Sequence, residues 1–385
     1  MEKLKLGDIC KIVTGSTPKT SIAEYWDGNI NWITPVELTE DTYIVNDSQR
    51  KITNRAIEET GLKSFPKGTV ILTSRAPIGK VAIAGKEMYC NQGFKNLICS
   101  SKINNKYLYW YLKGHTEYLN SLGRGATFKE ISKTIVENIE IPVPDLDTQK
   151  NCVDVLEKCN KIIKSYQKQL KSFDTLVKSR FIELFGDGQY TMKRVEEVCS
   201  YVVDCPHTTP KYEGKLVNPA IRTTEIKKGY IIWDTMRYVS DEEYEERVSR
   251  LKPKAGDIVY GREGTFGNAA ILPRGYKFCL GQRVMLLRPD YKQCLSEYLL
   301  YAVISDDVYR QAKAKNNAST VAHVNVKDVK QFTIPVPQLK LQEQYADFVA
   351  QTDKSKYYNF TSYKYCVLAA KLIRQEWMLC QTLSF

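Results

Sequence analysis

The sequence contains two copies of one unit, and this internal repeat limits the folds open to the chain more than any other feature. Similar short segments recur in the same order at a spacing of roughly 190 residues, which chance does not produce. Each copy is therefore expected to form one plan, a head followed by a long helix. The matched segments are Lys5–Val13 with Arg194–Val202, Gly15–Pro18 with Pro206–Pro210, Pro66–Leu72 with Lys254–Tyr260, Ser74–Arg75 (and Gly79) with Gly261–Arg262 (and Gly267), Asn91–Gly93 with Gly281–Arg283, Tyr107–Leu112 with Tyr298–Val303, and Ile141–Pro144 (and Gln149) with Ile334–Pro337 (and Gln342).

A long helix is predicted between Asp145 and Gly186, because this stretch contains neither proline nor glycine. Asp145 is the predicted N-cap, and Gly186 is the predicted residue after the C-terminal end. Apolar or aromatic side chains, with Arg180 as the exception, recur in alternating steps of four and three, which is typical of a coiled-coil seam. The seam positions are Cys152, Leu156, Cys159, Ile163, Tyr166, Leu170, Phe173, Val177, Arg180 and Leu184.

The second copy predicts a partner helix at about Leu339–Cys380, with a seam that is apolar at its ends and polar in its middle. We expect the two helices to pack antiparallel as a pseudo-two-fold rod with one head at each end. The matching seam positions are Tyr345, Val349, Thr352, Lys356, Asn359, Tyr363, Cys366, Ala370, Ile373 and Trp377.

The heads show short β-runs between turns, mixed with short helices, so the predicted fold class is α+β: two heads joined by two long antiparallel coiled-coil helices. The predicted boundaries are 1–144 for head one, 145–186 for the first helix, 187–337 for head two and 338–385 for the second helix. The predicted local elements are strands at Asp8–Val13, Thr69–Ser74, Val81–Ala84, Ile258–Tyr260 and Val284–Leu287, helices at Asn104–Lys113 and after a capping box at Ser240–Glu243, and a linker at Gly186–Lys193.

Composition narrows the partner class. The formal net charge is +12, which favours a polyanion and, first among these, nucleic acid. The sequence has 11 cysteines without a C-x-x-C pair and only 3 histidines, so a zinc site is not expected. It also lacks an apolar run long enough for a membrane span and a signal-peptide core. We therefore expect a cytoplasmic protein with reduced thiols.

Catalytic motifs find little support in the sequence. Gly261–Gly267 has the wrong spacing for a dinucleotide-binding loop, and Ser74–Lys80 lacks residues that a phosphate loop needs, so both are predicted to be tight turns. The acidic run Asp241–Glu246 is predicted to be a solvated helix face. His207 and His323 have no partners at the spacing of a catalytic triad or metal site. An Asn-Pro-Pro-Tyr or Asp-Pro-Pro-Tyr tetrapeptide, which adenine methyltransferases need, does not occur.

DNA contacts are better supported, because both heads place basic, amide and hydroxyl side chains on turns at matching positions. Arginine pairs with guanine and glutamine with adenine in the major groove, and Ser, Thr and Lys commonly hold phosphates. Basic loops at Gly123–Lys129 and Lys313–Thr320 add to this pattern. The candidate DNA-binding residues are Ser16, Thr17, Lys19, Arg75, Lys80, Gln92, Lys95, Arg124, Lys129, His207, Thr208, Lys211, Arg262, Gln282, Arg283 and Lys315.

These segments resemble a known family. Gly15-Ser-Thr-Pro-Lys19, followed by Glu24-Tyr-Trp-Asp-Gly-Asn-Ile-Asn-Trp-Ile-Thr-Pro35, resembles the opening of target-recognition domains in type I restriction–modification specificity subunits. Pro206-His-Thr-Thr-Pro-Lys-Tyr212 resembles another common opening of these domains. The paired Ile-Pro-Val-Pro segments and Arg180-Phe-Ile-Glu-Leu-Phe-Gly186 also resemble the family, and the likeness extends over essentially the whole chain. The C-terminal helix departs from it at Ile373–Met378.

The resemblance implies a subunit without catalytic activity, in which each head recognises one half of a bipartite, asymmetric double-stranded DNA site. The helices would set the gap between the halves and dock two methyltransferase subunits, which carry S-adenosylmethionine. A translocase–nuclease that uses ATP and Mg can join such a complex, and the sequence does not tell whether this chain has one as a partner. No cofactor or metal is expected on this chain itself. The residues predicted for subunit docking are Gln149, Leu156, Ile163, Leu170, Val177, Phe181, Gln342, Val349, Ile373 and Trp377.

Two alternatives remain open at this stage. The chain is then either the detached recognition part of a single-chain restriction–methylation enzyme, or a coiled-coil scaffold that binds only protein. The recognised DNA sequence does not follow from the residues, because readout also depends on loop geometry and DNA shape.

Overall fold

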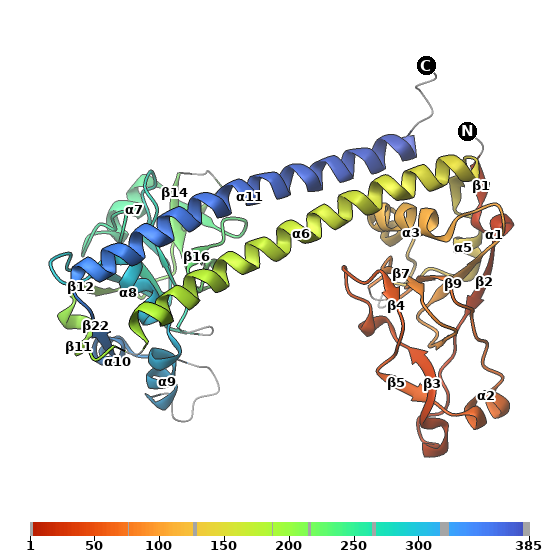
Figure 1. Cartoon of the computed structure of the whole chain (residues 1–385), viewed down its shortest axis with the longest axis horizontal. Helices are drawn as coiled ribbons and strands as arrows, with labels where there is room; N and C mark the ends of the chain where they lie inside the picture. The colour runs from red at the N-terminus through yellow and green to blue at the C-terminus, as the bar shows by residue number, and fades with distance from the viewer. Residues whose placement is uncertain are drawn as a thin grey trace. The chain divides into compact units, whose positions relative to one another are not determined.

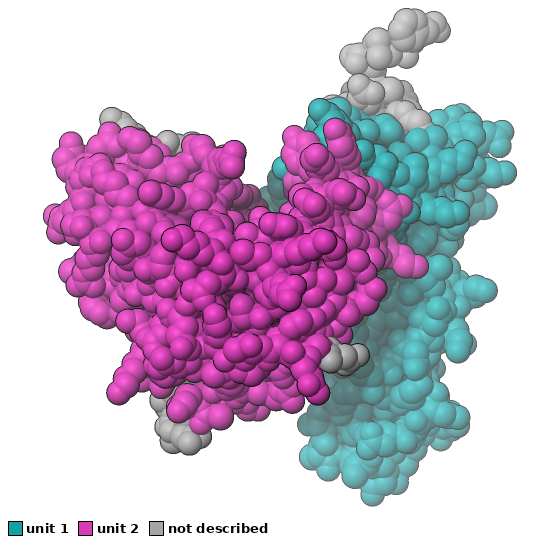
Figure 2. Space-filling model, turned by 60° about the vertical axis from the view of Figure 1, so that its left-hand side comes forward, with its two compact units in different colours: residues 1–167, 361–385 teal, residues 168–360 magenta. Residues whose placement is uncertain are grey.

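The computed structural model describes residues 3–75, 77–125, 129–186, 188–214, 217–263, 267–315 and 323–379. It divides into two compact units, residues 1–167 with 361–385 (unit 1) and residues 168–360 (unit 2), which Figure 2 colours separately. Head one belongs to unit 1 and head two to unit 2, and each long helix contributes one segment to each unit.

A five-stranded sheet forms the centre of unit 1 (Figure 1). In sheet order its strands are β2 (Cys10–Thr14), β9 (Lys95–Cys99), β6 (Val70–Leu72), β7 (Val81–Ala84) and β4 (Ile44–Val45). Successive residues of a strand point to opposite faces, so the sheet contributes to two separate cores. Leu72 packs with the helical layer on one face, and Ile71 packs with a smaller sheet on the other.

The remaining elements of unit 1 cover these two faces. The smaller sheet has the order β5 (Arg50–Ile52), β3 (Trp26–Ile33), β8 (Tyr89–Cys90), and β1 (Lys3–Lys5) pairs with β10 (Glu140–Pro142). The helices of unit 1 are α1 (Leu6–Ile9), η1 (Ala23–Tyr25), η2 (Pro35–Glu37), α2 (Asn54–Thr60), α3 (Asn105–Gly114), α4 (Thr116–Ser121) and α5 (Lys133–Glu137), with the first part of α6 (Leu146–Phe185) and the last part of α11 (Leu339–Leu379).

Unit 2 repeats this plan. Its central sheet has the order β12 (Cys199–Asp204), β21 (Val284–Pro289), β18 (Ile258–Gly261), β19 (Ala269–Ile271), and its second sheet has the order β13 (Tyr212–Glu213), β17 (Arg237–Val239), β14 (Asn218–Ile221), β20 (Cys279–Leu280). The other elements are β11 (Thr191–Arg194), β22 (Thr333–Val336), β15 (Ile226–Lys227), β16 (Tyr230–Ile231), η3 (Val195–Glu197), η4 (Thr223–Glu225), α7 (Asp241–Arg247), α8 (Ser296–Val303), α9 (Asp306–Lys315) and α10 (Val326–Gln331).

The topology confirms the internal repeat. In both units the first and last strands of the head pair antiparallel, as β1 with β10 and as β11 with β22. The orders β2-β9-β6-β7 and β12-β21-β18-β19 correspond strand by strand, and the smaller sheets each contain one parallel pair, β3 with β8 and β14 with β20.

One match of the repeat is shifted by a residue. The backbone N–H of Ser74 donates to Gly93 O at 2.7 Å, and the equivalent bond in head two runs from Arg262 to Arg283 O at 3.0 Å. Ser74 therefore corresponds to Arg262. The sequence match had paired Ser74 with Gly261, one residue earlier. The same shift makes Glu263 the counterpart of Arg75.

Helix α6 has the predicted extent. The Asp145 carboxylate accepts a hydrogen bond from the Thr148 N–H at 2.8 Å, which confirms the N-cap. Gly186 follows the last helical residue but does not have a positive φ. Glycine suits this position for another reason, because a Cβ here would lie 2.5 Å from Ile182 O. Each predicted seam position of α6 is buried or half-buried, as the pattern required.

The seam of α11 is also buried or half-buried at its predicted positions from Tyr345 to Ile373. Its polar middle is not unpaired: Lys356 forms an ion pair with Asp174 of α6 within unit 2. In the same unit, the Tyr345 hydroxyl donates to Val177 O at 3.4 Å. Within unit 2 the two helices therefore run antiparallel, because the contacted residue of α11 changes from 356 to 345 as the residue of α6 changes from 174 to 177.

Several local predictions need correction. The strand expected at Asp8–Val13 begins only at Cys10, because Leu6–Ile9 forms the short helix α1. The expected linker Gly186–Lys193 ends earlier, since β11 starts at Thr191 and pairs with β22. Ser240 does cap α7, but only its own side of the predicted capping box is present. The helix expected at Asn104–Lys113 is confirmed, with Asn104 as its cap.

Candidate nucleic-acid interface

Loops from four parts of head one meet at one place. The hydroxyl of Thr17, in the loop after β2, donates to Gln92 Oε1 at 2.6 Å, and Gln92 lies in the loop before β9. Both residues are exposed. The Ser74–Gly93 backbone bond attaches the loop after β6, and the Ile131 N–H donates to Ser74 O at 3.0 Å. Candidate residues that are far apart in the sequence therefore form one surface.

Glu130 joins the basic residues of this surface. Its carboxylate lies 2.8 Å from Arg75 Nε and 3.2 Å from Lys95 Nζ. Burial opposes ionisation of Glu130, but the hydrogen bonds from Arg75 and Lys95 outweigh it and hold the carboxyl pKa below its usual value. Arg75 remains about half exposed, so this charge is accessible to a ligand.

Lys95 was predicted to contact DNA, but the structure buries its side chain. Its side chain is only 6% exposed, and its ammonium also donates to the Ser74 hydroxyl at 3.1 Å. A buried lysine must be paired, and here the pairing fixes the positions of Ser74 and Glu130. Lys80 has a similar role, because its half-buried ammonium donates to Leu38 O at 2.6 Å.

Two tryptophans hold the opening loop of head one from behind. The Trp32 indole N–H donates to Ser16 O at 3.1 Å, and the Trp26 indole N–H donates to Lys19 O at 3.3 Å. Their rings pack edge to face at 5.0 Å, and the Arg50 guanidinium lies 3.7 Å from the Trp26 ring centroid. Buried indoles need acceptors for their N–H groups, so this arrangement fixes the loop that carries the exposed Ser16, Thr17 and Lys19.

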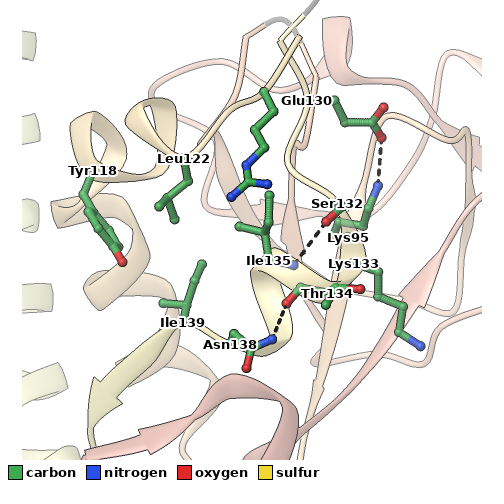
Figure 3. A pocket seen from close by; sticks show the side chains of 11 residues that line it. Lys95, Tyr118, Leu122, Glu130, Ser132, Lys133, Thr134, Ile135, Asn138 and Ile139 are labelled. Carbon is green, nitrogen blue, oxygen red and sulfur yellow. Dashed lines mark hydrogen bonds and ion pairs between the residues drawn. The ribbon is translucent and has the colours of Figure 1, made fainter.

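A hollow of about 920 Å³ opens beside Glu130. In Figure 3, Lys95 and Glu130 lie on one side of this hollow, and Tyr118 and Leu122 lie on the other. Arg124 also lines it and is exposed. Lys129 is exposed nearby in sequence, whereas residues 126–128 of the predicted basic loop lie outside the described residues.

Head two brings the corresponding residues together. The Gln282 amide donates to the Thr209 hydroxyl at 2.9 Å, at the position of the Thr17–Gln92 contact in head one. Arg283 follows Gln282 and has a φ of 66°, a left-handed backbone that is rare for arginine. Its guanidinium is 61% exposed and forms an ion pair of 2.8 Å with Glu263. Glu263 also lies 3.1 Å from His323.

Arg262 was also predicted to contact DNA, but its side chain is only 6% exposed. It forms an ion pair of 2.8 Å with Asp204, the last residue of β12. Asp204 also lies 3.3 Å from His207, whose side chain is 74% exposed. Arg262 contacts Asp204, and Asp204 contacts His207, which is the most exposed of the three side chains. Arg262 therefore positions His207 through Asp204, from inside the head.

A single buried guanidinium holds the opening loop of head two. Arg247, at the end of α7, is 6% exposed and donates to Leu280 O at 3.0 Å. It also donates to Thr208 O at 3.3 Å and contacts the Thr208 hydroxyl at 3.4 Å. Thr208 is exposed, yet part of its hydrogen-bonding capacity is used to anchor the loop.

The other predicted DNA contacts lie at the surface. Lys211 is exposed after the opening loop of head two. Lys315 is exposed but is the last residue of helix α9, so the basic segment expected as a loop from Lys313 begins within a helix. Residues 316–320 of that segment lie outside the described residues. Gly79 and Gly267, in the two segments expected to be tight turns, have φ values of 90° and 82°, whereas residues 76 and 264–266 of these segments lie outside the described residues.

The residues predicted for subunit docking mostly face inward. Gln149 and Gln342 are corrected: both are fully buried and hold a head against its long helix. Gln149 accepts from the Asn104 N–H at 2.7 Å and donates to Pro144 O at 2.8 Å, and Gln342 makes the equivalent bonds to Leu295 and Pro337. The remaining docking candidates are buried or half-buried, namely Leu156, Ile163, Leu170, Val177, Phe181, Val349 and Ile373. The Trp377 side chain lies outside the described residues.

Sequence reasoning missed the residues that support the loops, which are Glu130, Trp26, Trp32, Asp204, Arg247 and Thr209. The tryptophans were visible in the opening motif, but their N–H acceptors were not. No spacing rule relates Arg247 to Thr208, because the contact joins a helix to a loop 39 residues away.

Neither a metal centre nor a membrane span emerges from the part of the chain that the structure describes. Within it, His, Cys, Asp and Glu side chains do not cluster in threes as a metal ion would require. The helices described there are too short or too polar to cross a bilayer.

Residues 1–172 and 189–358 match the family model for the type I restriction modification DNA specificity domain. The MjaIX type I restriction enzyme specificity subunit of Methanocaldococcus jannaschii is 44% identical over 155 residues, which are 40% of this chain and 36% of that relative. The EcoR124I/EcoR124II specificity subunit of Escherichia coli is 28% identical over 40% of this chain and 39% of its own. The chain thus spans less than half the length of these two relatives.

Other likenesses extend over nearly the whole chain. The MjaVIII specificity subunit of Methanocaldococcus jannaschii is 21% identical over 91% of this chain and 86% of that relative. The crystal structure of a type I restriction–modification S subunit from M. genitalium has a TM-score of 0.55 at 14% identity, and covers 98% of this chain and 96% of its own. A chain from a structure on complex assembly of the type I R-M system has a TM-score of 0.61 at 15% identity, over 98% and 97%. These structures share the fold.

Proposed function

Since the chain belongs to the family of type I restriction–modification DNA specificity proteins, we propose that it recognises a bipartite DNA site and directs partner enzymes to it. Each head binds one half-site, and the two half-sites differ. The partners are two methyltransferase subunits, which modify adenine with S-adenosylmethionine, and a translocase–nuclease that uses ATP and Mg can join them. This chain supplies recognition and no catalytic group.

The observation that carries this proposal is the repetition of one loop arrangement with different side chains. Both heads carry the same threonine–glutamine contact, Thr17 with Gln92 and Thr209 with Gln282. Beside it the side chains differ: Arg75 lies where head two has Glu263, and Gly93 lies where head two has Arg283. Equal backbone plans place two recognition surfaces in equivalent surroundings, while unequal side chains select different bases. An asymmetric bipartite site follows from this combination.

We infer that partner subunits dock on the sides of the long helices that lie opposite the seams, because the seam residues are turned inward. Large apolar side chains remain exposed there: Ile162 is 47% and Leu176 48% exposed on α6, and Tyr365 is 69% and Leu368 52% exposed on α11. Exposed apolar side chains of this kind mark a protein interface where they lie together as one patch. This moves the proposed docking surface away from the seam residues predicted from the sequence.

Selection from a random pool tests the recognition proposal. The full chain with its methyltransferase partner is incubated with duplexes of random sequence, and the bound fraction is sequenced. We expect a two-part motif with a fixed gap, and binding that weakens steeply with salt because Lys and Arg displace counterions. Equal binding of selected and scrambled duplexes at about 150 mM salt would contradict the proposal.

The length of the helices offers a second test. Insertion of one heptad into α6 and one at the matching position of α11 preserves the seam and adds about 10 Å of helix. We expect the gap in the motif to widen by about three base pairs, at roughly 3.4 Å each, with both half-sites unchanged. The control replaces a heptad by another of equal length with the same seam residues. An unchanged gap after the insertion would refute the role of the helices as a ruler.

A further inference from the structure

A threonine–glutamine contact lies at the same place in the fold of each head, and it is called a clasp below. In head one the clasp is Thr17 with Gln92, at 2.6 Å. In head two it is Thr209 with Gln282, at 2.9 Å. In both, the threonine directly precedes a proline of the opening loop, and the glutamine lies two or three residues before a strand of the central sheet.

Both clasps lie at the surface, and neither forms part of a hydrophobic core. Thr17, Gln92 and Thr209 are exposed, and Gln282 is half-buried. A hydrogen bond between exposed neutral groups adds little to stability, since water competes for both partners. Its occurrence at equivalent positions of two heads with otherwise different side chains therefore indicates a role in ligand recognition.

The two clasps use opposite ends of the glutamine amide. Thr17 donates to the Gln92 carbonyl oxygen, which leaves the Gln92 amino group to donate. Gln282 donates through its amino group to Thr209, which leaves the Gln282 carbonyl oxygen to accept. An amide oxygen has two lone pairs and an amide nitrogen two hydrogens, so each clasp occupies one hydrogen-bonding position at one end. The clasp thereby orients the amide and leaves its opposite end fully free to contact a base.

We infer that Gln92 and Gln282 each contact one base of their half-site, and that Thr17 and Thr209 are positioning residues that decide which end of the amide faces it. This inference rests on the proposed function. The Gln92 amino group selects a base acceptor, such as guanine O6 or N7, adenine N7 or thymine O4. The Gln282 carbonyl selects a base donor, the amino group of adenine or cytosine.

The backbone beside Gln282 supports this assignment. Arg283 holds a φ of 66°, which costs an arginine free energy that the fold must supply. Such strain clusters at ligand-binding positions. The neighbouring Gly281 has no room for a side chain, because a Cβ would lie 2.7 Å from Ile221 O. Gln282 thus lies between a glycine that has no room for a side chain and an arginine in a strained backbone conformation, which helps to fix its direction.

The experiment uses the full chain with its methyltransferase partner and the same random duplex pool. Thr17→Val removes the hydroxyl at nearly constant shape, and Thr17→Ser retains it as the matched control. We expect Thr17→Val to lose base preference at one position of one half-site, while the other half-site stays sharp. Thr209→Val is expected to do the same in the other half-site, and both serine variants to retain the wild-type motif.

A second pair of variants tests which amide end faces the base. Gln92→Glu and Gln282→Glu add the same charge, so each is the control of the other. A carboxylate accepts but does not donate, and the hydroxyl of Thr209 can donate to it. Gln92→Glu should therefore lose or change its preferred base, whereas Gln282→Glu should keep its base at lower overall affinity.

The outcomes separate the inference from the proposed function. If the wild-type chain enriches no bipartite motif, the proposed function fails, and the inference with it. If it enriches one but the valine variants give the same motif, the clasps have no role in selectivity. Loss of a whole half-site in both the valine and the serine variant would assign the threonines to loop support and overturn the inference. A kept base in Gln92→Glu with a changed base in Gln282→Glu would overturn the assigned polarity.

Discussion

The opening loop of head one is held by two indole N–H groups, and the matching loop of head two is held by one buried guanidinium. Trp26 and Trp32 each bond one carbonyl and pack against each other. Arg247 instead bonds carbonyls of both Thr208 and Leu280. One backbone plan is thus stabilised by apolar packing in one copy and by a concentrated polar contact in the other.

This difference separates the contacts that both copies share from those that differ between them. Four strands follow the same order in both central sheets, and the buried glutamines Gln149 and Gln342 make equivalent hydrogen bonds in both copies. The charges at the surface do not, since Arg75 pairs with Glu130 where Glu263 lies beside His323. The support of the loop is interchangeable provided that its carbonyls are satisfied.

Removal of Arg247 is expected to have the largest effect. Arg247→Ala leaves the carbonyls of Thr208 and Leu280 without their donor and opens a cavity, at a cost of about 3 kcal/mol in stability. We expect head two to lose its half-site in duplex selection while head one keeps its own. Arg247→Met fills the volume without donors and serves as the control for packing. Simultaneous loss of both half-sites would contradict independent support of the heads.

Removal of one indole N–H in head one should have a smaller effect. Trp32→Phe breaks the bond to Ser16 O and reduces packing, at a cost of about 1–2 kcal/mol. Selectivity at the head-one half-site should weaken, and head two should be unaffected. The same change at Trp26, whose bond to Lys19 O is longer at 3.3 Å, is the internal comparison. A larger loss from Trp26→Phe than from Trp32→Phe would refute the ranking.

The ion pair of head one predicts a pH dependence. The pKa of Glu130 is depressed in the fold, so ionised Glu130 contributes stability above its ordinary value of 4.5, and this contribution is lost as the pH falls through the folded value. Arg75 and Glu130 are partly exposed but Lys95 is buried, so Glu130→Gln should cost about 1–2 kcal/mol near neutral pH.

Melting curves across pH test this assignment. The difference between Glu130→Gln and wild type should shrink as the pH falls below 4.5. Head two offers the matched control, since Glu263→Gln replaces the carboxylate that pairs with Arg283 and His323. A difference at Glu130 that does not change with pH would show that the ion pair is not its source.

The smallest expected change in stability is that of Arg283→Gly, which gives head two the residue that head one has at Gly93. Glycine adopts a φ of 66° without strain, but the variant loses an exposed ion pair and gains unfolded-state entropy, so stability should change by less than about 0.5 kcal/mol. DNA binding should show a loss instead, with a salt slope smaller by about 0.9 if Arg283 contacts one phosphate. An unchanged slope would exclude that contact.

The surface residues show how far prediction from sequence extends at the candidate site. Thr17, Gln92 and Arg283 were predicted and lie at the surface. Lys95 and Arg262 were predicted by the same criteria but are buried in ion pairs with Glu130 and Asp204. A basic residue on a turn has the same local pattern in either case. Its burial depends on a carboxylate that the fold brings from 35 or 58 residues away.

The sequence by itself determined the features that depend on neighbouring residues. The four-and-three spacing between Cys152 and Leu184 defines the buried face of α6, because helical periodicity places these side chains on one side. Asp145 caps that helix through a hydrogen bond within its own first turn. Repetition of such local patterns is also why the two-copy plan is visible before any contact is known.

Only the tertiary structure decided which side chains the candidate interface presents. It buried Gln149, aligned Glu263 rather than Arg262 with Arg75, and joined each threonine to its glutamine across more than 70 residues. The physical reason is that a polar group is buried, paired or exposed according to the partners around it. Those partners come from strands and loops that are distant in sequence and meet only when the sheets form.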